Sequence, residues 1–342
     1  MSVSRVLRVG TMSLRWEPRV VAVCAVLVAF ALGAAVSVVG SGDFPVSAAE
    51  VAGVLTGRGD RATEFIVLTL RLPRALTGLL AGAALGLSGA VFQSITRNPL
   101  GSPDIIGFTT GSATGALLQI LVIGGGAAAV AAGSVLGAVL TALAVYLVAY
   151  RGGVHGYRLV LVGVAAAAML EAFNAYLVTR AELREAYEAA FWLTGSLNGR
   201  GWQHAWPLAL ALAVLVPAAL AFGGRLRMGE LGDDAAQALG VPVQRTRTAL
   251  VVIGVGLVAV ATAAVGPVPF VALAAPQLAR GLTRKPGTQL VPAMLMGATL
   301  LVLSDLVTLH LPVAVPVGVV TGVLGGVYLV WLLSTEGGRG RA

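Results

Sequence analysis

The sequence predicts an all-α membrane protein with about ten transmembrane helices, and three observations carry this prediction. Of its 342 residues, 57% are hydrophobic and 11% are charged, whereas a soluble domain carries about 25% charged residues. The mean hydropathy is +0.90, and apolar runs of about 20 residues, the length that spans a bilayer, recur along the chain. Glycine, with 45 residues, is abundant, as in helices that pack closely inside lipid. Such a chain could not cover itself with polar surface in water.

Ten apolar segments are long enough, or shielded enough by neighbouring protein, to cross a membrane. We predict them at residues 20–39, 65–94, 104–123, 127–150, 157–179, 203–222, 245–265, 270–282, 289–310 and 315–333. Three prolines between residues 266 and 280 predict a break followed by re-entry into the membrane. Arginines precede the first segment, as they would a signal peptide, but its length and the apolar remainder of the chain favour a transmembrane helix.

The basic residues predict the orientation. With the N-terminus in the cytoplasm, 16 of the 23 Lys and Arg residues fall on the cytoplasmic side, which indicates an even number of spans with both termini inside. The other side keeps Arg58, Arg61, Arg71, Arg74, Arg180, Arg184 and Arg200. This gives a cytoplasmic segment 1–19, a transmembrane domain 20–333 with a cytoplasmic loop 225–243, and a cytoplasmic tail 334–342. Membrane orientation explains the scattered arginines better than a nucleic-acid partner does, and the single Cys24 can form no disulfide within the chain.

Two segments on the outer side are predicted to be helices that do not span the membrane. Residues 45–55 contain Ser47 and Glu50, the spacing of a capping box. Residues 181–193, AELREAYEAAFWL, are amphipathic and charged.

Glycines spaced by four predict close contacts between helices. They form three sets: Gly78, Gly82 and Gly86; Gly107, Gly111 and Gly115; Gly318, Gly322 and Gly326. A weak internal repeat relates residues 88–111 to residues 261–281, because Gly and Pro interrupt both after a long apolar segment. Interrupted segments at matching places of two halves are typical of transporters.

The sequence contains no catalytic motif such as HExxH, GxSxG or a phosphate-binding loop, so we expect neither an enzyme nor a metal site. Five polar side chains lie inside the predicted spans: Gln93, Glu171, Asn174, Gln277 and Asp305. Each could serve interhelical hydrogen bonding, worth about 0.6 kcal/mol on average. Glu171 and Asn174 share one helix face, however, and together with Gln93 they are candidates for a translocation pathway.

The stretch ELGDDAAQALGVP, residues 230–242, places acidic residues in a chain that is otherwise mostly hydrophobic and basic. It predicts a short helix with carboxylates in its first turn, a stop at Gly240 and Pro242 beyond. Charge alone would also suit a solvated loop, but the spacing acid-Ala-Ala-x-x-x-Gly is more specific. The candidate coupling residues are Glu230, Leu231, Asp233, Asp234, Ala235, Ala236 and Gly240.

Arg71 and Arg74 flank Pro73 at the outer end of the second span. They could anchor in lipid headgroups, or they could receive acidic groups of a soluble partner, since guanidinium groups pair well with carboxylates.

Several of these stretches resemble one transporter family. The acidic helix resembles the cytoplasmic "EAA" loop of ABC importer permeases, with Asp234 at the glutamate position. Residues 70–116, beginning LRLPRALTGLL, resemble the signature of FecCD-type permeases, the importers of iron siderophores, haem and vitamin B12. Residues 191–202, 265–280 and 316–333 resemble the same family in the same order. The stretches RNPLGSPDIIGF, GSLNG, LGDDAAQALGV and LGGVYLVWLL are most similar to G-type permease subunits of ferric enterobactin importers.

The resemblance implies the type II ABC importer architecture: ten spans per subunit, a second permease subunit, two ATPase subunits and an extracytoplasmic binding protein. A heterodimer is favoured over a homodimer. Arg71 and Arg74 would receive acidic residues of the binding protein, and the acidic helix would engage the ATPase. ATP is used by that partner, so this chain needs no cofactor. Its place would be the bacterial cytoplasmic membrane.

Two departures from the family pattern stand out. Many relatives have a histidine in a PHxxR stretch, where this chain has Gln277 in PQLAR. Many also carry an arginine shortly after the aspartate of the ninth span, whereas Asp305 is followed by LVTLHLP. A third docking arginine is therefore not expected.

The function expected is the permease subunit of an ABC importer for a ferric, enterobactin-like siderophore. Vitamin B12 or haem is the alternative cargo. An ion-coupled secondary transporter, with Glu171 or Asp305 as a proton site, is less favoured, because such a carrier has no ATPase to engage the acidic helix.

Overall fold

The computed structural model describes residues 5–9, 12–42, 44–150, 153 and 156–339. Residues 1–4 and 340–342 of the two predicted terminal segments lie outside the described residues, as do Arg151 and His155. The chain begins with a short antiparallel hairpin of β1 (Arg5–Val9) and β2 (Met12–Trp16). The rest of the described secondary structure is helical, as the fold class predicts.

Helices occupy all ten predicted positions. They are α1 Pro18–Gly40, α2 Ala48–Leu55, α3 Arg61–Glu64, η1 Phe65–Arg71, α4 Leu72–Thr96, α5 Phe108–Leu118, η2 Gln119–Ile123, α6 Ala127–Ala149, α7 Gly156–Arg180, α8 Leu183–Leu193, α9 Trp202–Ala221, α10 Gly223–Gly229, α11 Asp233–Ala238, α12 Val243–Val265, α13 Val271–Thr283, α14 Leu290–His310 and α15 Val317–Arg339. Among the described residues, seven helices are long and apolar enough to cross a membrane, and the apolar stretches Phe108–Ile123 and Val317–Val330 are shorter. The predicted eighth span is the 13-residue α13.

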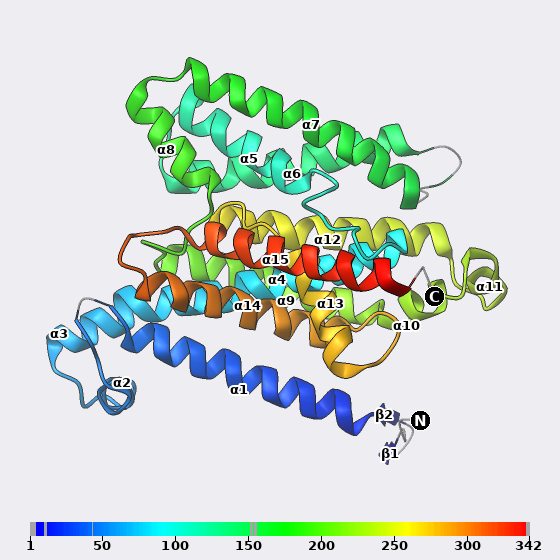
Figure 1. Ribbon diagram of the computed structural model, residues 1–342, viewed down its shortest axis with the longest axis horizontal. Helices are drawn as coiled ribbons and strands as arrows, with labels where there is room; N and C mark the ends of the chain where they lie inside the picture. The colour runs from blue at the N-terminus through cyan, green and yellow to red at the C-terminus, as the bar shows by residue number, and fades with distance from the viewer. Residues whose placement is uncertain (1–4, 10–11, 43, 151–152, 154–155, 340–342) are drawn as a thin grey trace.

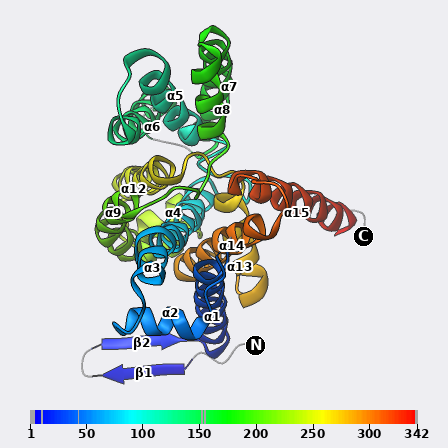
Figure 2. The same cartoon turned by 90° about the vertical axis from the view of Figure 1, so that its left-hand side faces the viewer.

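The long helices run side by side along the length of the molecule (Figure 1). Helices α5 to α8 form a layer on one side, α1 lies at the opposite edge, and α4, α9 and α12 to α15 lie between them (Figures 1 and 2). The outer-surface helices predicted from sequence, α2 and α8, lie at one end of the bundle. The strands β1 and β2, the C-terminal end of α15 and the acidic helix α11 lie at the other end, which agrees with an even number of crossings.

The central helices approach closely because glycines face each other. A Cβ on Gly82 of α4 would lie 2.4 Å from the carbonyl oxygen of Gly297 on α14, and a Cβ on Gly297 would lie 2.2 Å from that of Gly82. Helices α5 and α6 approach in the same way: a Cβ on Gly115 would lie 2.0 Å from the carbonyl oxygen of Gly133. For these two helix pairs the packing role predicted for the spaced glycines is confirmed.

The third glycine set behaves differently. Gly318 of α15 is tight against the carbonyl oxygen of Thr194, but Gly326 faces open space. The close contact is made by its neighbour Gly325, whose Cβ would lie 2.1 Å from the ring of Phe270. The four-residue spacing therefore selected the wrong glycine of the Gly325–Gly326 pair, because the position of one aromatic ring decides which of them must lack a side chain.

The predicted breaks are present in both halves. An irregular stretch separates α4 from α5, and residues 266–270 separate α12 from α13. The second break uses two residues with positive φ, Gly266 (79°) and Phe270 (67°). The helix that leads into α4 also departs from α-helical geometry: residues Phe65–Arg71 form a π-helical segment just before Pro73, where proline offers no N–H for an α-helical bond.

Candidate functional sites at the two ends of the bundle

The acidic stretch, residues 230–242, folds into a compact helical projection, here called the knob. Helix α11 spans Asp233–Ala238, and Gly240 follows it with a left-handed φ of 82°. The N–H of Gly240 donates to the carbonyl of Gln237 at 2.9 Å, and the N–H of Val241 donates to that of Ala236 at 3.0 Å. These two bonds are those of a Schellman stop, so the helix end predicted at Gly240 is confirmed.

Salt bridges tie this knob to the membrane helices. The Asp233 carboxylate accepts hydrogen bonds from Arg97, just past the end of α4, and from Arg247 of α12 at 3.0 Å. Partial burial disfavours the charged form of Asp233, but Arg247 and Arg97 outweigh it and hold its pKa below the usual range. Glu230 binds the end of the α13–α14 connection, just before α14, accepting from the N–H and the hydroxyl of Thr288, both at 2.5 Å. The knob therefore contacts three parts of the bundle: the end of α4, helix α12 and the loop before α14.

The opposite side of α11 is exposed. Asp234 and Ala235 are exposed, whereas Ala236 is fully buried and packs inward. Leu231 and Leu239 are 68% and 61% exposed. Asp234 makes neither a hydrogen bond nor an ion pair with any described residue. The knob thus presents a carboxylate between two exposed leucines, a surface suited to a protein partner rather than to the bundle itself.

At the far end of the bundle lies a cavity of about 550 Å³, here called the outer cavity. It opens among the end of α1, the start of α4, the loop before α9 and the α14–α15 connection. Its lining includes Ser41, Arg71, Arg74, Asn198, Asp305 and Pro316. Both predicted docking arginines therefore line one hollow.

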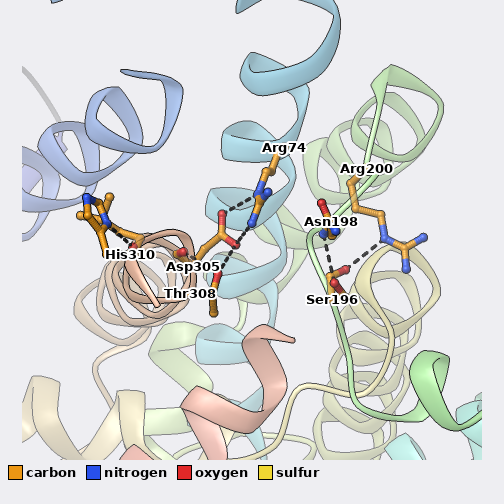
Figure 3. Close-up of polar contacts among 8 residues, drawn as sticks. Arg74, Ser196, Asn198, Arg200, Asp305, Thr308 and His310 are labelled. Carbon is orange, nitrogen blue, oxygen red and sulfur yellow. Dashed lines mark hydrogen bonds and ion pairs between the residues drawn. The ribbon is translucent and has the colours of Figure 1, made fainter. Parts of the chain in front are cut away.

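Both arginines form hydrogen bonds with other residues of this chain. Arg71 donates to the carbonyls of Val39 at 3.0 Å and Phe44 at 2.6 Å. Arg74 binds Asp305 of α14 with two hydrogen bonds, which Figure 3 shows. The partnership with Asp305 has no counterpart in the sequence predictions.

The loop before α9 supplies polar atoms to the same region (Figure 3). The N–H of Asn198 donates to the Ser196 hydroxyl at 3.1 Å, and Arg200 Nε donates to the Ser196 carbonyl at 3.1 Å. Ser196 and Asn198 both line the outer cavity. They belong to the GSLNG stretch, for which the sequence indicates a family resemblance and no individual role.

Two of the three predicted pathway residues share a second cavity, of about 530 Å³, here called the lateral cavity. Glu171 and Asn174 line it from α7, opposite Thr109 of α5, so the shared face predicted for them is confirmed. Glu171 is exposed, whereas Asn174 is 7% exposed and its Oδ1 has no hydrogen-bond partner among the described residues. An unpartnered buried oxygen beside a cavity is suited to a polar group or a water inside it.

Gln93 lies elsewhere. It is 5% exposed and joins α4 to α13: its Nε2 donates to the Leu273 carbonyl at 3.0 Å, and its Oε1 accepts from Arg280 at 2.7 Å and Gln277 at 3.3 Å. Gln277, at the position where the resemblance leads us to expect a histidine, therefore belongs to a hydrogen-bond cluster between helices. Gln93 lines neither the lateral nor the outer cavity, and a pathway role for it stays a prediction.

Comparison with known proteins gives a consistent result. A model of the FecCD transport family matches residues 25–335. The ferric enterobactin transport system permease protein FepG of Escherichia coli is 42% identical over 320 residues, which cover 93% of this chain and 97% of that protein. The achromobactin transport system permease protein CbrC of Dickeya dadantii is 37% identical and covers 88% of each chain.

Solved structures share the fold. An inward-facing structure assigned to the metal-chelate type of ABC transporter matches with a TM-score of 0.81 and 28% identity, covering 92% of this chain and 99% of that one. PsaBC from Streptococcus pneumoniae matches with a TM-score of 0.55 at 15% identity, which shows the fold alone. Since the family model and the relatives span nearly the whole chain, this protein belongs to the FecCD transport family.

Proposed function

We propose that this chain is the permease subunit of an ATP-driven importer of ferric siderophores, with an enterobactin-like complex as its cargo. The observation that carries the proposal is the near full-length similarity to FepG, a ferric enterobactin permease. The similarity to the achromobactin permease CbrC supports a siderophore as the cargo class. The chain is a multi-pass protein of the bacterial cytoplasmic membrane.

Coupling to ATP would run through α11. Its exposed face, with Asp234 between Leu231 and Leu239, suits a cleft on an ATPase subunit that binds and hydrolyses the nucleotide. Asp233 and Glu230 connect the same knob to α4, α12 and the start of α14. A displacement of the knob would therefore reach three segments of the bundle, and this chain itself would hold no cofactor.

Docking would occur at the other end. The outer cavity gathers Arg71 and Arg74, which suits an extracytoplasmic binding protein that presents carboxylates. This assignment places both termini, the loop 225–243 and residues 334–342 in the cytoplasm. A second permease chain completes the route; a heterodimer is favoured, and lipid covers the remaining apolar surface.

The cargo would pass by α7. The lateral cavity brings Glu171 and Asn174 together among mostly small and apolar residues, so we assign them to the translocation pathway. Gln93 is kept as a third, more distant candidate. The alternative cargoes, haem and vitamin B12, would use the same route. An ion-coupled carrier is disfavoured because Asp305 is engaged by Arg74 and because the knob would then have no partner.

The test is co-purification and uptake. An affinity-tagged chain, extracted with its partners, should carry along an ATPase, a second permease and, with ferric siderophore present, a binding protein. Cells that express the complex should take up radiolabelled ferric enterobactin, and cyanocobalamin and haemin in parallel assays separate the alternative cargoes. Retention of the binding protein should fall in Arg71→Glu/Arg74→Glu; equal retention would remove the docking assignment.

A further inference from the structure

The Arg74–Asp305 pair has a specific geometry. Arg74 Nε lies 3.0 Å from Asp305 Oδ2 and Arg74 Nη2 lies 2.7 Å from Asp305 Oδ1, so the carboxylate covers one edge of the guanidinium group (Figure 3). The Asp305 side chain is 2% exposed and the Arg74 side chain 17%. The Thr308 hydroxyl lies 3.4 Å from Oδ1 of the same carboxylate. Both residues line the outer cavity, but the aspartate is almost fully buried and the arginine is the more exposed of the two.

The opposite edge of the guanidinium group is available. An arginine carries five N–H groups in a planar fork, and Asp305 uses those on Nε and one on Nη2. The N–H groups of Nη1 donate to no described residue, and Arg74 lines the outer cavity. A second carboxylate can therefore bind the edge formed by Nη1 and Nη2 without displacing Asp305.

Asp305 has little freedom to release Arg74. A carboxylate that is almost fully buried is strongly destabilising when it loses its counter-ion. The helices that carry the two residues are also fixed, because Gly82 of α4 and Gly297 of α14 leave no space between their backbones. The guanidinium group is consequently held in one place before any partner arrives.

We propose that Asp305 is a positioning residue for docking: it occupies one edge of Arg74 and so presents the other edge to a carboxylate of the binding protein in the outer cavity. The inference rests on the proposed docking role of this cavity. An arginine that is already ordered loses less side-chain entropy on binding. In this arrangement Asp305, although acidic, strengthens the binding of an acidic partner.

The affinity of the binding protein for Asp305→Asn distinguishes this positioning role from one in which Asp305 competes with the partner's carboxylate for Arg74. In Asp305→Asn the amide NH2 faces the N–H groups of Arg74, so the guanidinium group loses its fixed orientation. We expect the binding protein that co-purifies with the importer to bind this variant about tenfold more weakly, in lipid nanodiscs at fixed salt. If Asp305 merely competes for Arg74, the same variant binds more tightly, and the proposal is overturned.

Exchanging the two charges distinguishes a residue that orients Arg74 for docking from an ion pair that only stabilises the contact between α4 and α14. Arg74→Asp/Asp305→Arg keeps an ion pair between α4 and α14 but moves the cation to α14. We expect its thermal unfolding midpoint to exceed that of Asp305→Asn while its docking stays as weak. A swap that restores both stability and docking would mean that the pair acts only as a clamp, and would refute the positioning role.

A chemical probe tests the geometry without the partner. Phenylglyoxal, an arginine-selective reagent, should modify Arg74 in the purified complex, and bound binding protein should protect it, as peptide mass spectrometry can follow. Failure of the reagent to reach Arg74 while it modifies Arg58 would contradict the exposed edge. If the unmodified complex does not bind the protein at all, the proposed function fails; if Arg74→Ala weakens docking and Asp305→Asn does not, this inference alone fails.

Discussion

Asp233 and Arg247 join the knob to the membrane: the first residue of α11 accepts two hydrogen bonds from an arginine of α12 that is only 8% exposed. Arg97, beyond the end of α4, binds the same carboxylate. One side chain therefore connects the exposed acidic helix to two helices of the core.

This connection predicts a pH dependence. The pKa of Asp233 is lowered, so its stabilising contribution is fully present above the pKa of an ordinary aspartate and is lost as the pH falls through the lowered value. A spin label at Gln237→Cys, in a Cys24→Ser background, should report a tightly held α11 near neutral pH and a mobile one only in strong acid. Asp233→Asn should be mobile throughout; a pH-independent wild type would contradict the role of the ion pairs.

Asp234 should act in coupling and not in folding, because it is exposed and has no partner among the described residues. Asp234→Arg is expected to lower siderophore uptake about tenfold, within the usual range of coupling energies, with unchanged amounts in the membrane and a thermal unfolding midpoint near that of the wild type. The control is Glu188→Arg, an exposed charge reversal on α8 at the other end of the bundle. Normal uptake by Asp234→Arg would count heavily against a coupling surface here.

Gly240 should tolerate no side chain without strain. Its φ of 82° lies in the left-handed region, although open space surrounds the position of a Cβ, and that conformation costs a non-glycine residue about 1–2 kcal/mol. Gly240→Ala should therefore loosen α11 and reduce uptake, and Gly240→Pro, which also removes an N–H donor, should reduce it further. Gly229→Ala is the matched control, since its surroundings are also open and its φ is not positive.

The α4–α14 contact predicts a difference between two identical substitutions. Gly82→Ala places a methyl group where the carbonyl oxygen of Gly297 lies at 2.4 Å, so the helices must separate. We expect a loss of about 1–3 kcal/mol in stability, the range for overpacking, measured as a lower thermal unfolding midpoint in detergent. Gly326→Ala, where nothing lies within 4 Å, should match the wild type. Equal midpoints for the two variants would show that the α4–α14 contact can accommodate a methyl group without loss of stability.

Glu171 offers a test of the pathway by charge. A ferric tris-catecholate complex is an anion, so removing a carboxylate from the lateral cavity should raise its uptake a few-fold, since like charges repel more strongly in a low-dielectric route. Uptake of a cationic ferric complex should change in the opposite direction in Glu171→Ala. Because Glu171 is exposed, the protein should assemble normally. If assembly fails instead, Glu171 is a packing residue.

Features that depend on local sequence patterns could be predicted from the sequence. Apolar runs locate the ten helices, the capping box at Ser47 and Glu50 is present with a 2.7 Å bond, and Gly240 ends α11 as predicted. Each of these features depends on neighbours within a few positions. They could therefore be predicted without knowledge of the tertiary structure.

The contacts that define the two candidate sites depend on distant residues. Arg97 and Asp233 are 136 positions apart, and Arg74 and Asp305 are 231 positions apart. No periodicity relates such partners, since only the packing of α4 against its neighbours brings them together. For the same reason sequence reasoning weighed Asp305 as a possible proton site, whereas the structure pairs it with Arg74.

Helix α4 carries a charged contact at each of its ends, and this has a mechanical consequence. Arg74 and Arg97 are 23 positions apart along it, which at 1.5 Å per residue separates them by about 35 Å, slightly more than the hydrocarbon core of a bilayer at about 30 Å. Because glycines of α4 pack directly against the backbone of α14, we expect α4 to move as one unit between those two contacts. If an ATPase subunit displaces the acidic helix as proposed, we expect the resulting tilt of α4 at Arg97 to change the angle at which Arg74 meets a docked protein.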